Sequence, residues 1–458
     1  MLLSAAVVAG CSTDDDGDAG PTDASPTSSP TTQAAPSEPE PVAEFPNTPA
    51  GQQSRWVLDQ LDEESGPDAD EAAERFSDLF LDEVPAEEVA ATFDSLRTLG
   101  PFTPVSYSGE SHQAVVDLIA ADDTCYQLSV GIDDDETIGG LYMQPTADAP
   151  DVASWDELDA ALAETGAEIA VYAARDDDGA WMPVHESSAD ASRPLGSMFK
   201  LYVLGAVQRA VLDGEVSWDD EVTVTSELRS LPSGELQDAA DGTAVTVAEA
   251  AEKMISISDN TATDMLIDLV GREAVEAAVT QMGHHEPSQL QPFLTTSEFF
   301  RLGWTEPELP DMWADSNVEQ RRSLLEDLPP DISAVDVAAV GTEPRWPSGI
   351  EWFASAEDIA AAHRSLQQLA AQDETQTLRD LMSVNSGLAV DADDWPYIAF
   401  KGGSSAGVLA YSWYLEDADG TGHVLVVQLS SEDPDMIADQ AHVGAVVQQA
   451  FDLLAGSQ

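Results

Sequence analysis

The stretch "SRPLGSMFKLYVLGAV" at residues 192–207 places a serine three residues before a lysine, where an apolar helix begins. A buried lysine is costly unless its charge or its lone pair is used. Ser197 and Lys200 are nearly one helical turn apart, so both side chains lie on one face, beside the free N–H groups of the helix N-terminus. A neutral Lys200 can take the Ser197 proton, and a charged Lys200 can stabilise the resulting alkoxide. The S-x-x-K pattern alone is weak, because many helices contain it by chance.

Two further motifs follow in the chain. An S-D-N motif at residues 258–260 stands immediately before a helix, and K-G-G at residues 401–403 lies at the end of a strand. In this order, S-x-x-K, S-D-N and a partial K-T-G resemble the serine penicillin-binding proteins and the class A β-lactamases, and the resemblance covers residues 154–458. The structural alternative is that the S-D-N residues only form a turn and that the lysine is a surface residue.

The resemblance implies a role for each motif residue in a reaction through an acyl-serine intermediate. Ser197 is the expected nucleophile, and Lys200 is its activating partner. Ser258 is expected to relay a proton to the leaving nitrogen or oxygen. Asn260 is expected to orient the substrate and Lys200. Lys401 is expected to supply positive charge near Ser258 and near an anionic group of the substrate.

The oxyanion hole implied by the resemblance consists of the backbone N–H groups of Ser197 and Ser404. Gly403 would let the edge strand approach the substrate closely. The threonine of the family's K-T-G motif is Gly402 in this chain. A hydroxyl that would bind a substrate carboxylate is therefore lost, unless Ser404 or Ser405 replaces it.

A second departure concerns the glutamate with which class A β-lactamases hydrolyse their acyl-enzyme, in an E-x-x-x-N pattern ahead of a "TT" helix start. In "MGHHEPSQLQPFLTTSEFFRL" (282–302), Glu286 is the only acid before Thr295, and Leu290 stands four residues after it. Glu298 is expected to be a first-turn acid of the next helix. We therefore expect an enzyme that acylates but hydrolyses β-lactams poorly, or that uses another water-activating group.

The chain is expected to be α+β. A capping box at 154–157 predicts a helix, and a β-hairpin is expected at 168–187. The middle of the chain, from 197 to about 385, is mainly helical, and three strands and a closing helix at 441–456 follow it. Because strands bracket a helical middle, we expect the first and last strands to pair in one antiparallel sheet. The resemblance implies a β-lactamase-like domain, an antiparallel sheet with a helical subdomain, over 154–458.

A smaller α+β domain is predicted at 51–148, where helical segments precede four strand-like segments. Its order and position are similar to the NTF2-like, isomerase-like cone domain that precedes a β-lactamase-like domain in a clavulanic-acid biosynthesis enzyme. Residues 1–11 form a short apolar run that ends in Cys11. This run resembles a bacterial lipobox, which implies a signal peptide and lipidation of Cys11. The alternative is a chance apolar N-terminus. The Ser/Thr/Pro/Asp tract at 12–50 cannot bury a core and is expected to be a disordered linker.

The acid excess bounds the partners. The chain has 17 Lys+Arg against 87 Asp+Glu, a formal net charge of −70 that is spread along its whole length. Such a surface repels nucleic acid and anionic lipid. It favours a protein adapted to strong salt, where repulsion is screened, with an ordinary acidic exported protein as the alternative. We expect no nucleic-acid partner, a monomer, and contact with the membrane through the lipid anchor only.

No cofactor and no metal are expected. His284 and His285 are the only clustered histidines, and adjacent histidines point differently on a helix or a strand. Cys125 is expected to be a small core residue. Trp346 and Trp352 wall a pocket or simply pack in the core.

The sequence thus predicts an exported, membrane-anchored serine hydrolase that forms an acyl-Ser197 intermediate with a β-lactam, ester or amide substrate, small molecule or peptide. One alternative is a penicillin-binding type DD-peptidase or transpeptidase, which lacks the deacylating glutamate by nature. Another is a non-catalytic binding lipoprotein whose hydrolase domain has decayed.

Overall fold

The described part of the chain falls into two compact units, which separate at residues 148 and 149. The computed structural model describes residues 45–62, 66–77, 80–81, 84–109, 111–121, 124–133, 137–146, 149–177, 179–373, 375–392 and 394–456. The expected signal peptide, the expected lipidation site Cys11 and residues 12–44 of the expected linker lie outside these residues. The predicted end of the linker at residue 50 is wrong, because Ala50 is already buried in the core of the first unit within a helix that begins at Pro49.

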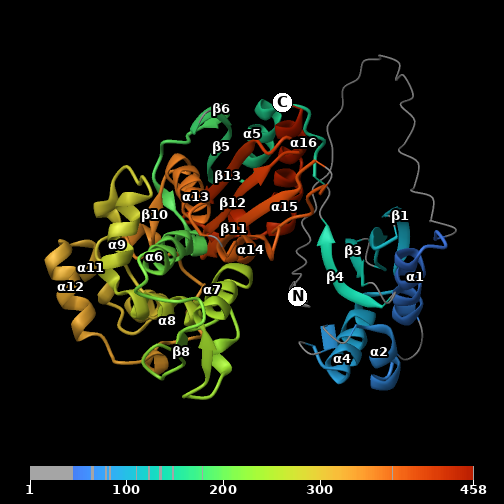
Figure 1. Cartoon of the computed structure of the whole chain (residues 1–458), viewed down its shortest axis with the longest axis horizontal. Helices are drawn as coiled ribbons and strands as arrows, with labels where there is room; N and C mark the ends of the chain where they lie inside the picture. Colours follow the sequence, from blue (N-terminus) through green and yellow to red (C-terminus); the bar gives the residue numbers. More distant parts are fainter. Residues whose placement is uncertain are drawn as a thin grey trace, which may run out of the picture. The chain divides into compact units, whose positions relative to one another are not determined.

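The first unit places helices before a four-stranded sheet (Figure 1). Its helical elements are α1 (Pro49–Asp62), α2 (Ala69–Arg75), α4 (Ala86–Leu96) and the 3₁₀ turn η1 (Arg97–Leu99). Its antiparallel sheet has the order β1-β2-β3-β4, with strands β1 (Thr103–Gly109), β2 (Gln113–Ile119), β3 (Cys125–Ile132) and β4 (Ile138–Thr146). The helices-then-strands order predicted for this part of the chain is confirmed.

Alternation along β2 builds the core of the first unit. Alternate side chains of β2 are buried, as a half-covered strand requires. They pack with an aromatic group of Trp56, Phe76 and Phe93, in which the Trp56 ring centroid lies 6.2 Å from Phe76 and 5.8 Å from Phe93. Cys125 is only half-buried at the start of β3, so its prediction as a core residue was too strong.

The second unit is built on a five-stranded antiparallel sheet (Figure 1). Its strand order is β11-β12-β13-β5-β6, and the strands are β5 (Glu168–Asp177), β6 (Ala180–Ser187), β11 (Tyr397–Ser405), β12 (Val408–Glu416) and β13 (Gly422–Ser430). The central strand β13 is buried along its whole length. Because β13 pairs with β5, the prediction that the first and last strands join in one sheet is confirmed, and so is the hairpin β5–β6.

Helices cover both faces of this sheet. One face packs against α5 (Trp155–Ala163), α15 (Gln440–Gln448) and α16 (Ala450–Ala455). The other face joins the core of the helical part, in which α13 (Ala356–Ala370) lies against the sheet. Neighbouring residues of β13 contribute to opposite cores, Val424 and Val426 to one and Leu425 and Val427 to the other. The closing helix predicted as one segment is divided in two at Gln449.

The helical part of the second unit carries short strands between its helices. Its helices are α6 (Lys200–Leu212), α7 (Val247–Ser256), α8 (Asn260–Val270), α9 (Arg272–Gln281), α10 (Thr296–Trp304), α11 (Leu309–Ala314), α12 (Val318–Asp327) and α14 (Thr377–Ser383). Two-stranded ladders pair β7 (Arg193–Pro194) with β10 (Phe353–Ala354) and β8 (Glu221–Thr223) with β9 (Ala244–Thr246). The remaining 3₁₀ turns are η2 (Gly196–Phe199), η3 (Leu236–Asp238), η4 (Pro287–Leu290), η5 (Ile332–Ala334), η6 (Trp346–Ser348) and η7 (Pro434–Ile437).

Capping side chains mark several of these helix starts. Ser154 caps α5 by accepting from the Glu157 N–H at 3.3 Å, which confirms the predicted helix start, but the Glu157 carboxylate accepts from the Ala153 N–H instead of the Ser154 N–H, so the predicted capping box is incomplete. Glu298 forms a complete capping box at the start of α10, so the prediction that it is a first-turn acid is confirmed.

Over the described residues, no helix combines the length and the apolar character that crossing a bilayer requires.

Candidate active site

Ser197 lies in a tight turn between a short strand and a buried helix. The turn is the 3₁₀ element η2, and α6 begins directly after it at Lys200. Gly196 enters the turn with a φ of 50°, a conformation that glycine takes without steric cost. Ser197 is partly exposed, whereas its neighbours in the turn are buried. Among the described residues, the Ser197 hydroxyl has no hydrogen-bond partner.

Lys200 is completely buried and reaches the S-D-N motif. Its Nζ donates to the Ser258 carbonyl at 2.6 Å, to Ser258 Oγ at 3.0 Å and to Asn260 Oδ1 at 2.7 Å. Asn260 Nδ2 donates to the Leu231 carbonyl at 3.0 Å, which fixes the amide so that its oxygen faces the lysine. The expected orientation of Lys200 by Asn260 is therefore present in the geometry.

The backbone around Ser258 is held by its neighbours. Ser258 has a φ of 60°, which is uncommon for a residue with a side chain. The next residue, Asp259, caps α8 and is fully buried. Its carboxylate accepts from the Ala262 N–H at 2.8 Å and from the N–H groups of Glu235 and Leu236 at 2.8 and 2.9 Å.

Lys401 comes from the edge strand β11 and converges on the same hydroxyl. Its Nζ donates to Ser258 Oγ at 3.1 Å and to the Gly402 carbonyl at 2.8 Å. The residue is nearly buried, at 3% exposure. The sequence predicts that Lys401 lies at the end of its strand, but β11 continues to Ser405. The ammonium groups of Lys200 and Lys401 thus approach one side chain from two different elements.

The strand β11 packs tightly against the turn that holds Ser197. A Cβ added to Gly403 would stand 2.6 Å from the Ser197 nitrogen, and one added to Gly196 would stand 2.5 Å from the Ser404 nitrogen. Both distances are too short for a side chain, so these two glycines let the turn and the strand touch. The two backbone nitrogens expected to form the oxyanion hole therefore come from segments in direct contact. Gly403 serves this packing first, rather than the approach to substrate that the sequence suggested.

Not every candidate position can supply the hydroxyl that the K-T-G motif lacks in this chain. A Cβ on Gly402 would come within 2.9 Å of the Phe400 ring, so a threonine there requires that ring to move. Ser405 Oγ donates to Glu351 Oε2 at 2.8 Å and is engaged there. Ser404 is exposed, and its role as the replacement stays a prediction.

Burial shifts the pKa of both lysines. Complete burial, and then the nearby Lys401 ammonium, lower the pKa of Lys200 well below its ordinary value, against the opposing charges of Asp259 and Asp264. Burial lowers the pKa of Lys401 to about 7. Two ammonium groups that share one hydroxyl disfavour each other's charged form. Both burial and this repulsion lower the pKa of Lys200.

When Lys200 is neutral, its hydrogen bonds fix which group of this network donates and which accepts. A neutral amine has two N–H donors and one lone pair. Of the three partners of Lys200, the Ser258 carbonyl and Asn260 Oδ1 can only accept, so the Ser258 hydroxyl is the one that donates to the lone pair. Lys401, which donates to that same hydroxyl, favours this orientation. The order of donation then runs from Lys401 through Ser258 to Lys200.

Carboxylates act on this network through their charge, as Asp259 and Asp264 do on Lys200, and Glu351 is a further buried carboxylate nearby that the sequence did not single out. Among the described residues, no carboxylate hydrogen-bonds to Lys200. Glu286 is exposed and accepts from Gln289 Nε2 at 2.7 Å. Glu351, in contrast, is buried at 5% exposure and contacts β11 through Ser405. A lone acid within the apolar run "GIEWFA" (349–354) was the available signal.

The histidine pair lies differently from the expectation. The rings of His284 and His285 are stacked with centroids 5.5 Å apart, and both face Asp358. His284 accepts from the Glu286 N–H at 3.0 Å through Nδ1, so its Nε2 donates to the Phe353 carbonyl at 2.8 Å. With both ring nitrogens engaged by backbone, His284 has no lone pair left for a metal.

Residues 153–440 match the family model described as "Beta-lactamase enzyme family". Residues 45–138 match a second model, described as "ORF 12 gene product N-terminal". In a comparison with curated proteins, no sequence matched.

Several solved structures are similar to the chain. A β-lactamase from Sphaerobacter thermophilus DSM 20745 is 20% identical, with a TM-score of 0.45 over 67% of this chain and 98% of the other. A β-lactamase from Chitinophaga pinensis DSM 2588 is 17% identical, with a TM-score of 0.46 over 66% and 98%. An acyl-enzyme complex of a PBP-A variant with penicillin G is 20% identical, with a TM-score of 0.42 over 66% and 99%.

Proposed function

The chain belongs to the β-lactamase enzyme family, and on that premise we propose that it is a serine hydrolase that forms an acyl-enzyme at Ser197. The observation that carries the proposal is the meeting of two buried lysines, from α6 and β11, on one hydroxyl, Ser258. A structural role alone gives no reason to bury two ammonium groups when no described carboxylate is hydrogen-bonded to either of them.

The proposed acylation moves one proton from Ser197 to the leaving group through Lys200 and Ser258. Ser197 Oγ attacks the carbonyl carbon of a β-lactam, ester or amide, and its proton passes to the neutral Lys200. Catalytic hydrogen bonds often tighten only when substrate binds, which is when the Ser197 hydroxyl would join the network. Ser258 Oγ gives its proton to the leaving nitrogen or oxygen as the bond to carbon breaks, and Lys200 returns a proton to Ser258. The N–H groups of Ser197 and Ser404 bind the oxyanion.

Hydrolysis of the acyl-enzyme is proposed to be slow. No described carboxylate is bonded to Lys200 at a position from which it would activate a water on the ester. The same observation favours a second candidate, a penicillin-binding type DD-peptidase or transpeptidase, in which an amine or a water from the bulk takes the acyl group. Both candidates share the acylation step.

The cellular setting is also a proposal. Lipidation at Cys11, with residues 12–44 as a spacer, would anchor the enzyme outside the cytoplasm on a membrane, as a monomer. The four strands and preceding helices of the first unit support the proposal of an NTF2-like cone domain, with a structural or substrate-gating role.

The test is acylation of the soluble protein by a fluorescent penicillin and by a chromogenic ester, followed by intact mass. We expect an adduct of the penicillin on Ser197 that persists for minutes or longer, and slow ester turnover. Ser197→Ala should abolish both. Ser192→Ala, a nearby exposed serine that donates to Gln289, is the matched control and should keep them.

Rapid turnover of the penicillin would contradict slow deacylation while leaving acylation intact. Absence of any adduct and of ester hydrolysis would favour the non-catalytic binding lipoprotein. Release of the acyl group onto an added D-amino-acid amine would identify the transpeptidase.

A further inference from the structure

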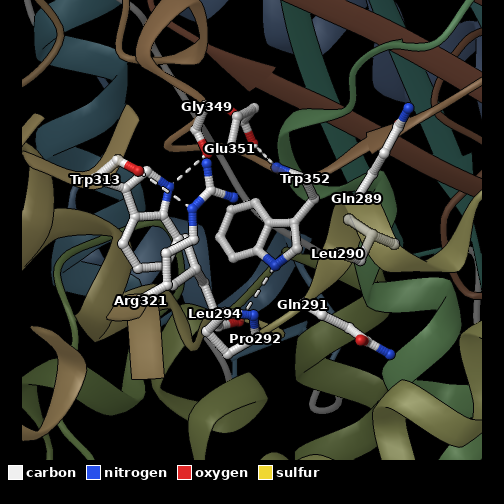
Figure 2. Close-up of a pocket in the computed structure, with 10 residues that line it drawn as sticks. All are labelled: Gln289, Leu290, Gln291, Pro292, Leu294, Trp313, Arg321, Gly349, Glu351 and Trp352. Atoms are coloured by element: carbon white, nitrogen blue, oxygen red, sulfur yellow. Dashed lines mark hydrogen bonds between the residues drawn. The ribbon is translucent and has the colours of Figure 1, made fainter. Parts of the chain in front are cut away.

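Glu351 lies at the wall of a pocket beside the candidate active site. Figure 2 shows its carboxyl group next to Trp352, with the Arg321 guanidinium between the rings of Trp313 and Trp352. Arg321 Nε donates to the Trp313 carbonyl at 3.2 Å, and no ion pair joins it to Glu351 among the described residues. Glu351 is thus a buried acid whose partners are hydrogen-bond donors rather than a cation.

Both carboxyl oxygens of Glu351 are used. Oε1 accepts from the Trp352 N–H at 3.0 Å, and Oε2 accepts from Ser405 Oγ at 2.8 Å. Burial raises the pKa of Glu351 to about 7. Because burying an acid costs free energy, the presence of Glu351 at this position indicates that its hydrogen bonds are needed there.

The two partners of Glu351 connect it to the two segments that are expected to supply the oxyanion nitrogens. On one side, Ser405 follows Ser404 directly in β11. On the other side, the Trp352 carbonyl accepts from the Leu195 N–H at 2.9 Å, and the ladder β7–β10 continues that pairing. Leu195 enters the turn that holds Ser197. Hydrogen bonds of the Glu351 side chain and of the Trp352 backbone therefore connect β11 to the turn that holds Ser197.

We propose that Glu351 is a positioning residue that holds the N–H groups of Ser197 and Ser404 at the spacing of an oxyanion hole, through its hydrogen bond to Ser405. This inference rests on the proposed acyl-enzyme function. An oxyanion forms when Ser197 attacks and forms again when water attacks the ester. Loss of the spacing therefore slows acylation and deacylation alike. A glutamate that activates water would matter for deacylation only.

The experiment measures the rates of adduct formation and adduct loss with fluorescent penicillin, on the full chain, for a set of variants. Glu351→Ala and Ser405→Ala each break the contact, and we expect both rates to fall about 10–100-fold, because displaced oxyanion donors cost this much. The double variant should be no slower than either single variant. Ser405→Thr keeps a hydroxyl and should restore both rates to within about threefold.

Glu351→Gln separates positioning from water activation. The amide cannot act as a base, but its NH₂ can donate to Ser405 Oγ while its oxygen accepts from the Trp352 N–H, so we expect both rates to stay within about threefold. The matched control is Asp373→Ala, which removes a buried carboxylate that accepts from Gln208 and Trp218 beyond the end of α13. It should lower thermal stability without changing either rate.

Selective loss of deacylation in Glu351→Gln would overturn the proposal in favour of water activation. Unchanged rates in Ser405→Ala would overturn it as well, and that variant remains informative if Glu351→Ala does not fold. Absence of an adduct in the wild-type protein is a different result, because it refutes the acyl-enzyme function itself.

Discussion

Ser258 takes a backbone conformation that few serines adopt, and the lysine network depends on it. With a φ of 60°, the residue presents both its carbonyl and its hydroxyl to Lys200. Such a conformation persists only where the surroundings hold it. Ser233 Oγ, which donates to the Ser258 carbonyl at 2.7 Å, and the buried cap Asp259 are two of those surroundings. The hydroxyl that links the two lysines is therefore oriented before substrate arrives.

Lys401 should control the alkaline limb of the reaction with anionic substrates. Burial lowers its pKa to about 7, so the ammonium is present below pH 7 and is lost as the pH rises through that value. A penicillin carries a carboxylate that needs this charge, so its acylation rate should fall between about pH 6 and pH 9. Lys401→Arg keeps the charge and should move the midpoint upward by more than about one pH unit. Stopped-flow acylation across pH measures the midpoint.

A neutral ester serves as the control for this effect. It has no carboxylate to bind, so its rate should not fall over the same range. An identical alkaline limb for the ester and the penicillin would show that Lys401 acts on the chemistry rather than on the substrate charge.

At the scale of elements, the start of α8 joins the S-D-N motif to the rest of the helical part. Asp259 accepts three backbone N–H groups, one from α8 and two from the segment that enters η3. Asp259→Ala leaves these buried donors without a partner, so we expect the free energy of unfolding to fall by about 3 kcal/mol. Urea unfolding followed by circular dichroism measures the loss.

The matched control for Asp259 is a cap with one acceptor bond on an exposed helix. Asn317 caps α12, accepting from the Gln320 N–H at 3.1 Å, and α12 has no buried residue. Asn317→Ala should cost about 1 kcal/mol. Equal losses in the two variants would contradict the view that Asp259 braces two segments at once.

Local signals predicted most of the elements, because caps and alternation act over a few residues. The Ser154 cap, the β5–β6 hairpin and the strands of the first unit needed no tertiary information. The convergence of Ser258 and Lys401 followed from a family resemblance rather than from the residues. The contact of Glu351 with Ser405 spans 54 residues and leaves no local pattern, because it depends on how the intervening elements α13 and α14 and the strand β11 are packed.

Packing also overruled two expectations. The sequence gives no reason for β11 to continue past Gly403, but pairing with β12 extends it to Ser405. Adjacent histidines were expected to diverge, yet the irregular segment after α9 stacks their rings beside Asp358. Asp358 lies 73 residues from His285, whereas Ser405 pairs with Val408 across the β11–β12 hairpin, and the periodicity of a single segment predicts neither contact.

At the scale of the whole molecule, the acid excess opposes the compact state. The net charge is −70, and even complete pairing of the basic side chains would leave most carboxylates without a cation. Mutual repulsion between them is weakened as the Debye length falls from about 10 Å at 0.1 M salt to about 3 Å at 1 M. We propose that the chain is adapted to strong salt for this reason.

The free energy of unfolding should therefore rise with salt, by roughly 1–3 kcal/mol between 0.05 and 0.5 M KCl, where screening changes most. Urea unfolding at fixed pH measures the gain. Sucrose at equal osmolality is the control, because it is excluded from protein surfaces but screens no charge. A gain in KCl that sucrose does not reproduce assigns the effect to charge repulsion. If stability stayed constant in KCl, the carboxylates would be too far apart to repel in the folded state, and the acidic surface would serve solubility instead.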